Sequence, residues 1–143
     1  MTGLTNFDIL RCVQQLDIPH FRGVYMKDTL PASGPLKNEC AIVNFNTSQE
    51  SGSHWVCYYK KGSNRIYFDS FGQITPIEIQ QYLKTKQEIR EDNHVIQRNT
   101  DEVQAINSSE CGQLCLTVLS LLARDISFQS IINLLRQRYY GHP

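Results

Sequence analysis

Two residues on neighbouring predicted strands, His54 and Asp69, form the first pair of side chains that could do chemistry. The apolar segments 54–59 and 65–71 flank a polar stretch and predict a β-hairpin, with Gly62-Ser63 as a two-residue type II′ turn. In that register His54 and Asp69 are diagonal neighbours on one face of the hairpin, within reach of each other. A carboxylate placed there can fix the tautomer of an imidazole.

The pairing of His54 with Asp69 depends on the length of the turn. A two-residue turn pairs Val56 with Asp69 and His54 with Phe71, and a four-residue loop keeps His54 and Asp69 on the same face. A three-residue loop would put them on opposite faces, as unrelated strand residues. Aspartate is depleted in strand interiors and is rarely buried without a partner, which favours the pairing.

Cys111 is the candidate nucleophile, because it lies where a polar stretch passes into an apolar, helix-like segment. Three residues before it could each cap this helix: Asn107, Ser108 and Ser109. Glu110 would then fall in the first turn. A thiol in the first turn feels the positive end of the helix dipole, which favours the thiolate and lowers the pKa. Gly112 allows another backbone or a substrate to approach closely.

A second interpretation makes Cys111 a core residue like the other cysteines. The five are scattered and odd in number, which predicts buried free thiols in a reducing compartment rather than disulfides: Cys12, Cys40, Cys57, Cys111 and Cys115. Cys115, one turn deeper, is expected in the core. Cys111 and Cys115 could also bind a metal with a histidine, but no second ligand pair accompanies them, so we expect no metal site.

Gln104 precedes Cys111 by seven residues. Beside a cysteine nucleophile, a glutamine amide can donate to a developing oxyanion together with the Cys111 backbone N–H. Without such a nucleophile, a loop glutamine carries no functional meaning.

The spacing of apolar residues and the positions of turn-forming residues predict the helices and strands that carry these side chains. We predict four helices: over 5–16 with Thr5 as N-cap, from Pro76 toward Arg90, over 111–123 and over 128–139. We predict four strands, over 40–45, 54–59, 65–71 and 94–97. Residues 17–38 are expected to be mostly loop. Strands in the middle with helices before and after them predict an α+β fold, and the length predicts one domain, residues 1–143.

Composition excludes several classes of protein. The 143 residues are 41% hydrophobic and 20% charged, which is ordinary globular usage and not that of a disordered tail. The formal net charge is +0, so we do not expect extensive electrostatic binding of nucleic acid. No apolar run reaches the roughly 18 residues of a membrane span, and the first residues lack the pattern of a secretory signal, so we expect neither.

The order His54, Asp69, Gln104, Cys111 resembles the adenovirus protease (adenain) family and, more distantly, the ubiquitin-like-protein proteases that share its fold. The Tyr25 region with Lys27 is also similar, and the resemblance reaches to about residue 123. The other matching stretches are Cys40–Asn44, Gly52–Trp55, Tyr67–Gly72, Val103-Gln104 and Asn107–Gly112.

The resemblance implies a viral cysteine endopeptidase with a papain-like or adenain-like fold, a central, mostly antiparallel sheet packed against a buried helix with the nucleophile at its N-terminus. Cys111 would be that nucleophile. His54 would pair with its thiolate and protonate the leaving amine, and Asp69 would orient His54. Gln104 and the Cys111 N–H would form the oxyanion hole.

The resemblance also implies substrates: viral precursor proteins, cut at small-residue, glycine-containing sites during virion maturation in the infected cell, its nucleus included, and in the virion. Gly52, Ser53 and Trp55 would then wall a narrow groove, although Trp55 fits the core equally well. We expect a monomer.

The sequence departs from the family in three ways. Asp69 stands where adenovirus enzymes carry glutamate, and aspartate is the choice of the ubiquitin-like-protein proteases. Residues 92–95 contain no cysteine, which argues against a disulfide-linked cofactor peptide but leaves a non-covalent activating peptide open, by strand addition near His94. The neutral charge argues against stimulation by DNA, and Lys60-Lys61 fits a solvated turn.

Two other functions are compatible with the same residues. The same chemistry could remove ubiquitin or a ubiquitin-like modifier from host proteins, since those tails also end in glycine pairs. The fold could also serve as a non-catalytic binding module, although all four catalytic positions are filled.

Overall fold

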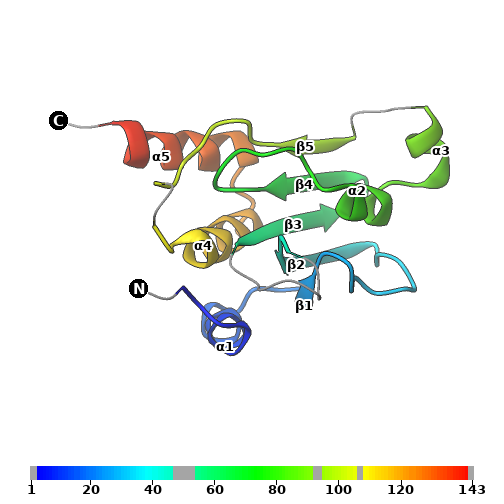
Figure 1. Ribbon diagram of the computed structural model, residues 1–143, viewed down its shortest axis with the longest axis horizontal. Helices are drawn as coiled ribbons and strands as arrows, with labels where there is room; N and C mark the ends of the chain where they lie inside the picture. The colour runs from blue at the N-terminus through cyan, green and yellow to red at the C-terminus, as the bar shows by residue number, and fades with distance from the viewer. Residues whose placement is uncertain (1–2, 47–53, 92–94, 106–107, 142–143) are drawn as a thin grey trace.

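One mixed sheet with helices on both of its faces dominates the computed structural model, which describes residues 3–46, 54–91, 95–105 and 108–141 (Figure 1). The strands are β1 (Phe21–Met26), β2 (Asn38–Asn44), β3 (Trp55–Lys61), β4 (Asn64–Phe68) and β5 (Ile96–Arg98). The helices are α1 (Asn6–Leu16), α2 (Ile77–Leu83), α3 (Lys86–Arg90), α4 (Cys111–Ala123) and α5 (Phe128–Tyr140). The α+β fold predicted from the sequence is confirmed.

The strands lie in chain order, β1-β2-β3-β4-β5. The centre of the sheet is antiparallel, since β3 pairs in that sense with both β2 and β4. Both edges are parallel pairs, β1 with β2 and β4 with β5. The longest ladder, between β2 and β3, is thus antiparallel, and the short strand β5 forms one edge.

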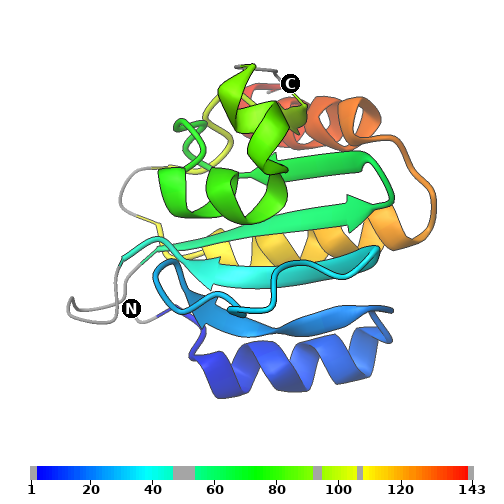
Figure 2. The same cartoon turned by 90° about the vertical axis from the view of Figure 1, so that its right-hand side faces the viewer.

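Side chains along each strand point alternately to the two faces of the sheet, and both faces carry an apolar layer. Cys40 and Ile42 of β2 face the larger layer, beneath α4, while Ala41 and Val43 face the smaller one, beneath α2. Figure 2 shows α2 and α3 in front of the sheet and α4 behind it. Helix α4 is therefore buried, with eight of its 13 residues in the interior, as its nearly all-round apolar sequence predicted.

The β3–β4 hairpin follows the predicted register up to the point where the ladder stops. Lys61 pairs with Asn64 across the Gly62-Ser63 turn, and Gly62 has φ +61° whereas Ser63 does not lie in the positive region, which fits type II′. The last ladder pair is Cys57 with Phe68. The predicted pairs Val56–Asp69 and His54–Phe71 are wrong as ladder pairs, because β4 ends at Phe68 and the chain turns there.

Residues 21–26 were wrongly predicted as loop. The turn-forming residues Pro19 and Gly23 led to the prediction of a loop. The segment is a strand because it pairs in parallel with β2. A register irregularity between Phe21 and Gly23 accommodates the glycine.

The single helix predicted from Pro76 toward Arg90 is wrong. Helix α2 ends at Leu83, Lys84 is extended, and Thr85 starts α3 with a capping box that Glu88 completes. The two short helices pack differently, since α2 buries Ile79 and Leu83 whereas α3 buries nothing. The predicted strand over 94–97 is found at Ile96–Arg98, and His94 lies outside the described residues.

A buried carboxylate ties the first half of the sheet together. Glu39 of β2 accepts hydrogen bonds from Arg22 of β1, Tyr58 of β3 and Tyr82 of α2. Because the charge is paired and fully hydrogen-bonded, its burial is tolerated, and the network fixes α2 on the sheet. Among the described residues, no helix is long and apolar enough to cross a membrane.

Candidate active site

His54 and Asp69 meet just beyond the end of the β3–β4 ladder. His54 directly precedes β3 and Asp69 directly follows β4, and imidazole Nε2 lies 2.7 Å from Asp69 Oδ1. The Asp69 side chain is 1% exposed and that of His54 15%. A pair so close and so shielded from water interacts strongly.

Asp69 is held by the tight turn that it opens. Its Oδ1 also accepts from the Phe71 N–H at 2.9 Å, and its carbonyl accepts from the Gly72 N–H at 2.8 Å. Asn99 clamps its backbone from the segment after β5, accepting from the Asp69 N–H at 3.1 Å and donating to the Asp69 carbonyl at 2.6 Å. Oδ2 is buried without a hydrogen-bond partner among the described residues. The carboxylate therefore directs its bonded oxygen to His54.

Two aromatic rings flank the imidazole of His54. Phe71 stacks on it with ring centroids 4.7 Å apart, and Phe45 lies tilted at 5.9 Å. Lys27 sits over the Phe45 ring, 5.0 Å from its centroid. These contacts set the plane of the imidazole, so that Nε2 faces Asp69 and Nδ1 is left for another partner.

The thiol of Cys111, the first residue of α4, lies near the imidazole and is among the groups that raise the pKa of His54. Its Sγ also accepts the backbone N–H of Trp55 at 3.4 Å. The predicted caps Ser108 and Ser109 are wrong, because Glu110 occupies the N-cap position without a side-chain capping bond and pairs instead with Arg138 of α5. Asn107, the third candidate, lies outside the described residues. Helix α4 begins one residue after Glu110, which puts the sulfur at its first position.

The pKa values of the thiol and the imidazole shift in opposite directions. Burial opposes charge on His54 and is the largest influence, but hydrogen bonds to Asp69 and Cys111 outweigh it and raise the pKa of His54 to about 9. Burial likewise opposes a Cys111 thiolate, yet the hydrogen bond to His54 and the N–H groups of Trp55 and Gly112 lower the pKa of Cys111. The pair thus favours a thiolate beside an imidazolium.

The neighbouring cysteines lack this environment. Burial raises the pKa of Cys40 to about 12, and burial together with a hydrogen bond to Cys57 raises that of Cys115 well above the ordinary value. Cys115 is fully buried in the core under the sheet, as predicted.

Gln104 is buried in the loop between β5 and α4 and is 1% exposed. Its Nε2 donates to the Ser108 carbonyl at 3.0 Å, and its Oε1 accepts from the Ser70 hydroxyl. The amide is thereby tied to the segment that leads into Cys111 and to the residue that follows Asp69.

Of the three residues predicted to wall a substrate groove, the structure describes only Trp55. Gly52 and Ser53 lie outside the described residues. Trp55 is half-buried against the main core and its indole N–H donates to the Leu4 carbonyl at 2.9 Å, while its backbone N–H faces the sulfur. Gly112 lets Trp55 and Leu4 come close, since a Cβ there would lie 3.2 Å from each.

Three residues around the site were not singled out from the sequence: Phe71, Asn99 and Ser70. The expected pairing of His54 with Phe71 was the available signal for the first. No local pattern marks the other two, because both act on partners some 30 positions away in the chain.

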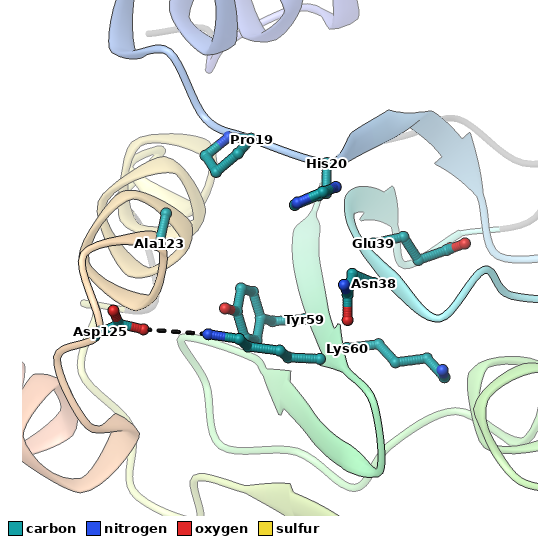
Figure 3. A pocket seen from close by; sticks show the side chains of 9 residues that line it. Pro19, His20, Asn38, Glu39, Tyr59, Lys60, Ala123 and Asp125 are labelled. Atoms are coloured by element: carbon teal, nitrogen blue, oxygen red, sulfur yellow. Dashed lines mark hydrogen bonds and ion pairs between the residues drawn. The ribbon is translucent and has the colours of Figure 1, made fainter.

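A cavity elsewhere on the molecule is separate from this site. Pro19, His20, Asn38, Tyr59 and Ala123 are among its lining residues (Figure 3). Ala123 ends α4 whereas Cys111 begins it, and a helix of 13 residues is about 20 Å long. Among the described residues, no cluster of histidine, cysteine and carboxylate side chains is arranged to hold a metal ion.

Residues 21–135 match the family model described as adenovirus endoprotease, which is most of the chain and includes His54, Asp69, Gln104 and Cys111. The chain belongs to the adenovirus endoprotease family. A protease of porcine adenovirus A serotype 3 is 27% identical over 133 residues, covering 85% of this chain and 65% of the relative. A protease of equine adenovirus B serotype 2 is 30% identical over 122 residues, covering 77% and 60%. The chain thus spans somewhat less than two thirds of the length of these curated relatives.

Two solved structures share the fold of this adenovirus endoprotease family member. The ASFV pS273R protease superposes with a TM-score of 0.58 at 17% identity, covering 99% of this chain and 68% of that one. The SUMO protease Ulp1, with its catalytic cysteine oxidised to a sulfinic acid, superposes with a TM-score of 0.51 at 12% identity, covering 94% and 74%. The adenain-like fold predicted by resemblance is confirmed.

Alkylation with iodoacetamide tests the state of Cys111. The lowered pKa of Cys111 and the raised pKa values of Cys40 and Cys115 give Cys111 the larger thiolate fraction at any pH, so Cys111 should react faster than these two cysteines, and its rate should fall as the pH drops through its lowered pKa. His54→Ala should slow the reaction at pH 7 by at least about tenfold. Mass spectrometry of tryptic peptides measures each rate. Equal, slow labelling of all five cysteines would contradict the assignment.

Substitution of Gly72 tests the turn that holds Asp69. Gly72 has φ +68°, and a Cβ there would lie 2.6 Å from the Thr100 carbonyl oxygen. Gly72→Ala should cost about 1–2 kcal/mol for the left-handed backbone and about 1–3 kcal/mol more for the overlap, and should slow alkylation of Cys111.

Gly34→Ala is the matched control, since Gly34 has φ +81° and open space around it. It should show only the first cost in urea unfolding, with alkylation unchanged. The same loss of stability in both variants would show that the close approach to Thr100 is unimportant.

Proposed function

We propose that the chain is a viral cysteine endopeptidase that hydrolyses peptide bonds through an acyl-enzyme on Cys111. The observation that carries the proposal is the hydrogen-bonded pair of Asp69 and His54 beside Cys111, whose sulfur lies at the first residue of a buried helix and accepts the Trp55 N–H next to His54. Membership of the adenovirus endoprotease family supports the same reaction class.

The chemistry follows from the charge state of the pair. The Cys111 thiolate attacks the carbonyl carbon of the scissile bond, and the developing oxyanion accepts from the Cys111 N–H and from Nε2 of Gln104. The imidazolium of His54 gives its proton to the leaving amine, so the C–N bond breaks and a thioester remains. Neutral His54 then takes a proton from water as the water attacks the thioester, which releases the acid and restores the ion pair. Asp69 stabilises the imidazolium throughout.

We propose viral precursor proteins as the substrates, cut at glycine-containing sites of small residues during virion maturation. Gly52, Ser53 and Trp55 next to His54 would form the walls of the groove. The enzyme would act as a monomer in the infected cell, including its nucleus, and in the virion. Any activating peptide would bind without a disulfide, because residues 92–95 contain no cysteine.

Turnover of peptides by the purified chain tests the reaction. A peptide library should be cleaved at glycine-containing sites, and Cys111→Ala should abolish cleavage, by at least about 10⁴-fold, while leaving the fold and unfolding free energy nearly unchanged. Asp125→Asn is a matched surface control and should cleave at the normal rate. Absence of turnover on both peptides and viral precursors would contradict the proposal and favour a non-catalytic binding module.

Removal of ubiquitin-like modifiers is the second candidate function. Asp69, rather than glutamate, favours it, since aspartate is what the resemblance to ubiquitin-like-protein proteases implies at this position. An electrophilic probe built on ubiquitin or SUMO separates the two functions. Rapid modification of Cys111 by the probe, with slow turnover of viral precursors, would favour this second function.

A further inference from the structure

The amide of Gln104 is held at both of its ends inside the protein. Its Oε1 accepts from Oγ of Ser70 at 2.5 Å, and its Nε2 donates to the Ser108 carbonyl at 3.0 Å. Ser70 is 0% exposed and Gln104 is 1% exposed, so water does not compete for these groups.

These two partners leave only one orientation of the amide. The Ser108 carbonyl can only accept, so it must face the NH₂ end of Gln104. The oxygen end then faces Ser70, whose hydroxyl is the donor. One N–H of Nε2 is used by Ser108, and the second has no acceptor among the described residues. Gln104 therefore keeps one free donor in a fixed direction.

Ser70 belongs to the turn that carries the carboxylate of Asp69. Its carbonyl accepts from the Val103 N–H at 2.7 Å, next to Gln104 in the chain. Asn99, at the start of the same segment, clamps the backbone of Asp69. We call residues 99–104 the strap. The turn and the strap thus form one hydrogen-bonded unit that carries both Asp69 and Gln104.

We propose that Ser70 is a positioning residue for Gln104, whose hydroxyl holds the amide so that its free N–H points to the oxyanion. The proposal rests on the proposed function, in which Gln104 donates to that oxyanion. It assigns Ser70 no contact with substrate. A donor fixed before the reaction needs no reorganisation in the transition state, so the effect belongs to the chemical step.

Loss of the hydroxyl frees one end of the amide. In Ser70→Ala the Oε1 atom loses its donor, so only the bond to the Ser108 carbonyl still holds the amide, and the free N–H is no longer fixed in direction. We expect kcat to fall about tenfold to a hundredfold, less than the 10²- to 10³-fold fall expected for Gln104→Ala, with KM nearly unchanged.

A double-mutant cycle separates positioning from general destabilisation. Once Gln104 is alanine, Ser70→Ala should lower kcat by less than about twofold further, because the hydroxyl has nothing left to position. Ser127→Ala is the matched control, since this hydroxyl caps α5 by accepting from the Ser130 N–H at 3.2 Å. It should lower stability and leave kcat unchanged. Additive losses in the double variant would overturn the proposal.

Hydrogen exchange of the Gln104 side-chain amide gives a readout that needs no turnover. Its ¹⁵N–¹H signals are identified by their absence in Gln104→Ala. Exchange should be at least tenfold faster in Ser70→Ala than in the wild type and unchanged in Ser127→Ala. Unchanged exchange in Ser70→Ala would overturn the proposal even if the enzyme is active.

The two readouts keep this proposal distinct from the proposed function. A wild-type chain without turnover contradicts the peptidase function, whereas exchange still decides whether Ser70 holds the amide. An active wild type with normal kcat in Ser70→Ala contradicts only the role of Ser70. Should Ser70→Ala fail to fold, Ser70→Cys places a larger, weaker donor at the same position and carries the same expectations in the same direction.

Discussion

The hydrogen bond between Asp69 and His54 is the interaction on which the rest of the site depends. The carboxylate, 2.7 Å from Nε2, offsets the cost of burying an imidazolium, and the imidazolium in turn offsets the cost of a buried thiolate at Cys111. Both residues lie just past the end of a ladder, so their side chains leave the sheet and meet the first residue of α4. The turn after β4 and the strap of residues 99–104 then hold the carboxylate in place.

The local sequence pattern was enough to predict helix α4 and the β3–β4 hairpin, which hold the candidate catalytic residues. The bounds of α4 follow from a long apolar run that starts where the polar loop ends, and Cys111 is its first residue. The hairpin turn follows from Gly62, and side-chain parity then puts His54 and Asp69 on one face. Parity survives small errors in strand length, which is why the two residues meet although the predicted ladder pairs beyond Cys57–Phe68 do not form.

Features that depend on distant partners could not be predicted in the same way. Strand β1 forms because it pairs with β2, whereas Gly23 within it favours a loop when the sequence is taken alone. The break between α2 and α3 reflects a capping box at Thr85 competing with helix continuation. The clamp by Asn99 and the bond from Ser70 to Gln104 join segments 30 and 34 residues apart, so no local window contains both partners. Glu110 takes the N-cap position without a side-chain capping bond, and its carboxylate accepts instead from Arg138, 28 residues away, which no local pattern indicates.

Titration of His54 by ¹⁵N NMR measures whether the imidazolium is stabilised by its neighbours. The ring should stay protonated at pH 7 and lose its proton near pH 9, because the raised pKa lets the imidazolium persist until the pH passes that value. In Cys111→Ala the midpoint should move to lower pH, since one of the two partners that favour the charged ring is gone. A midpoint at or below the ordinary value of about 6.5, unchanged by Cys111→Ala, would contradict the coupled ion pair and with it the proposed mechanism.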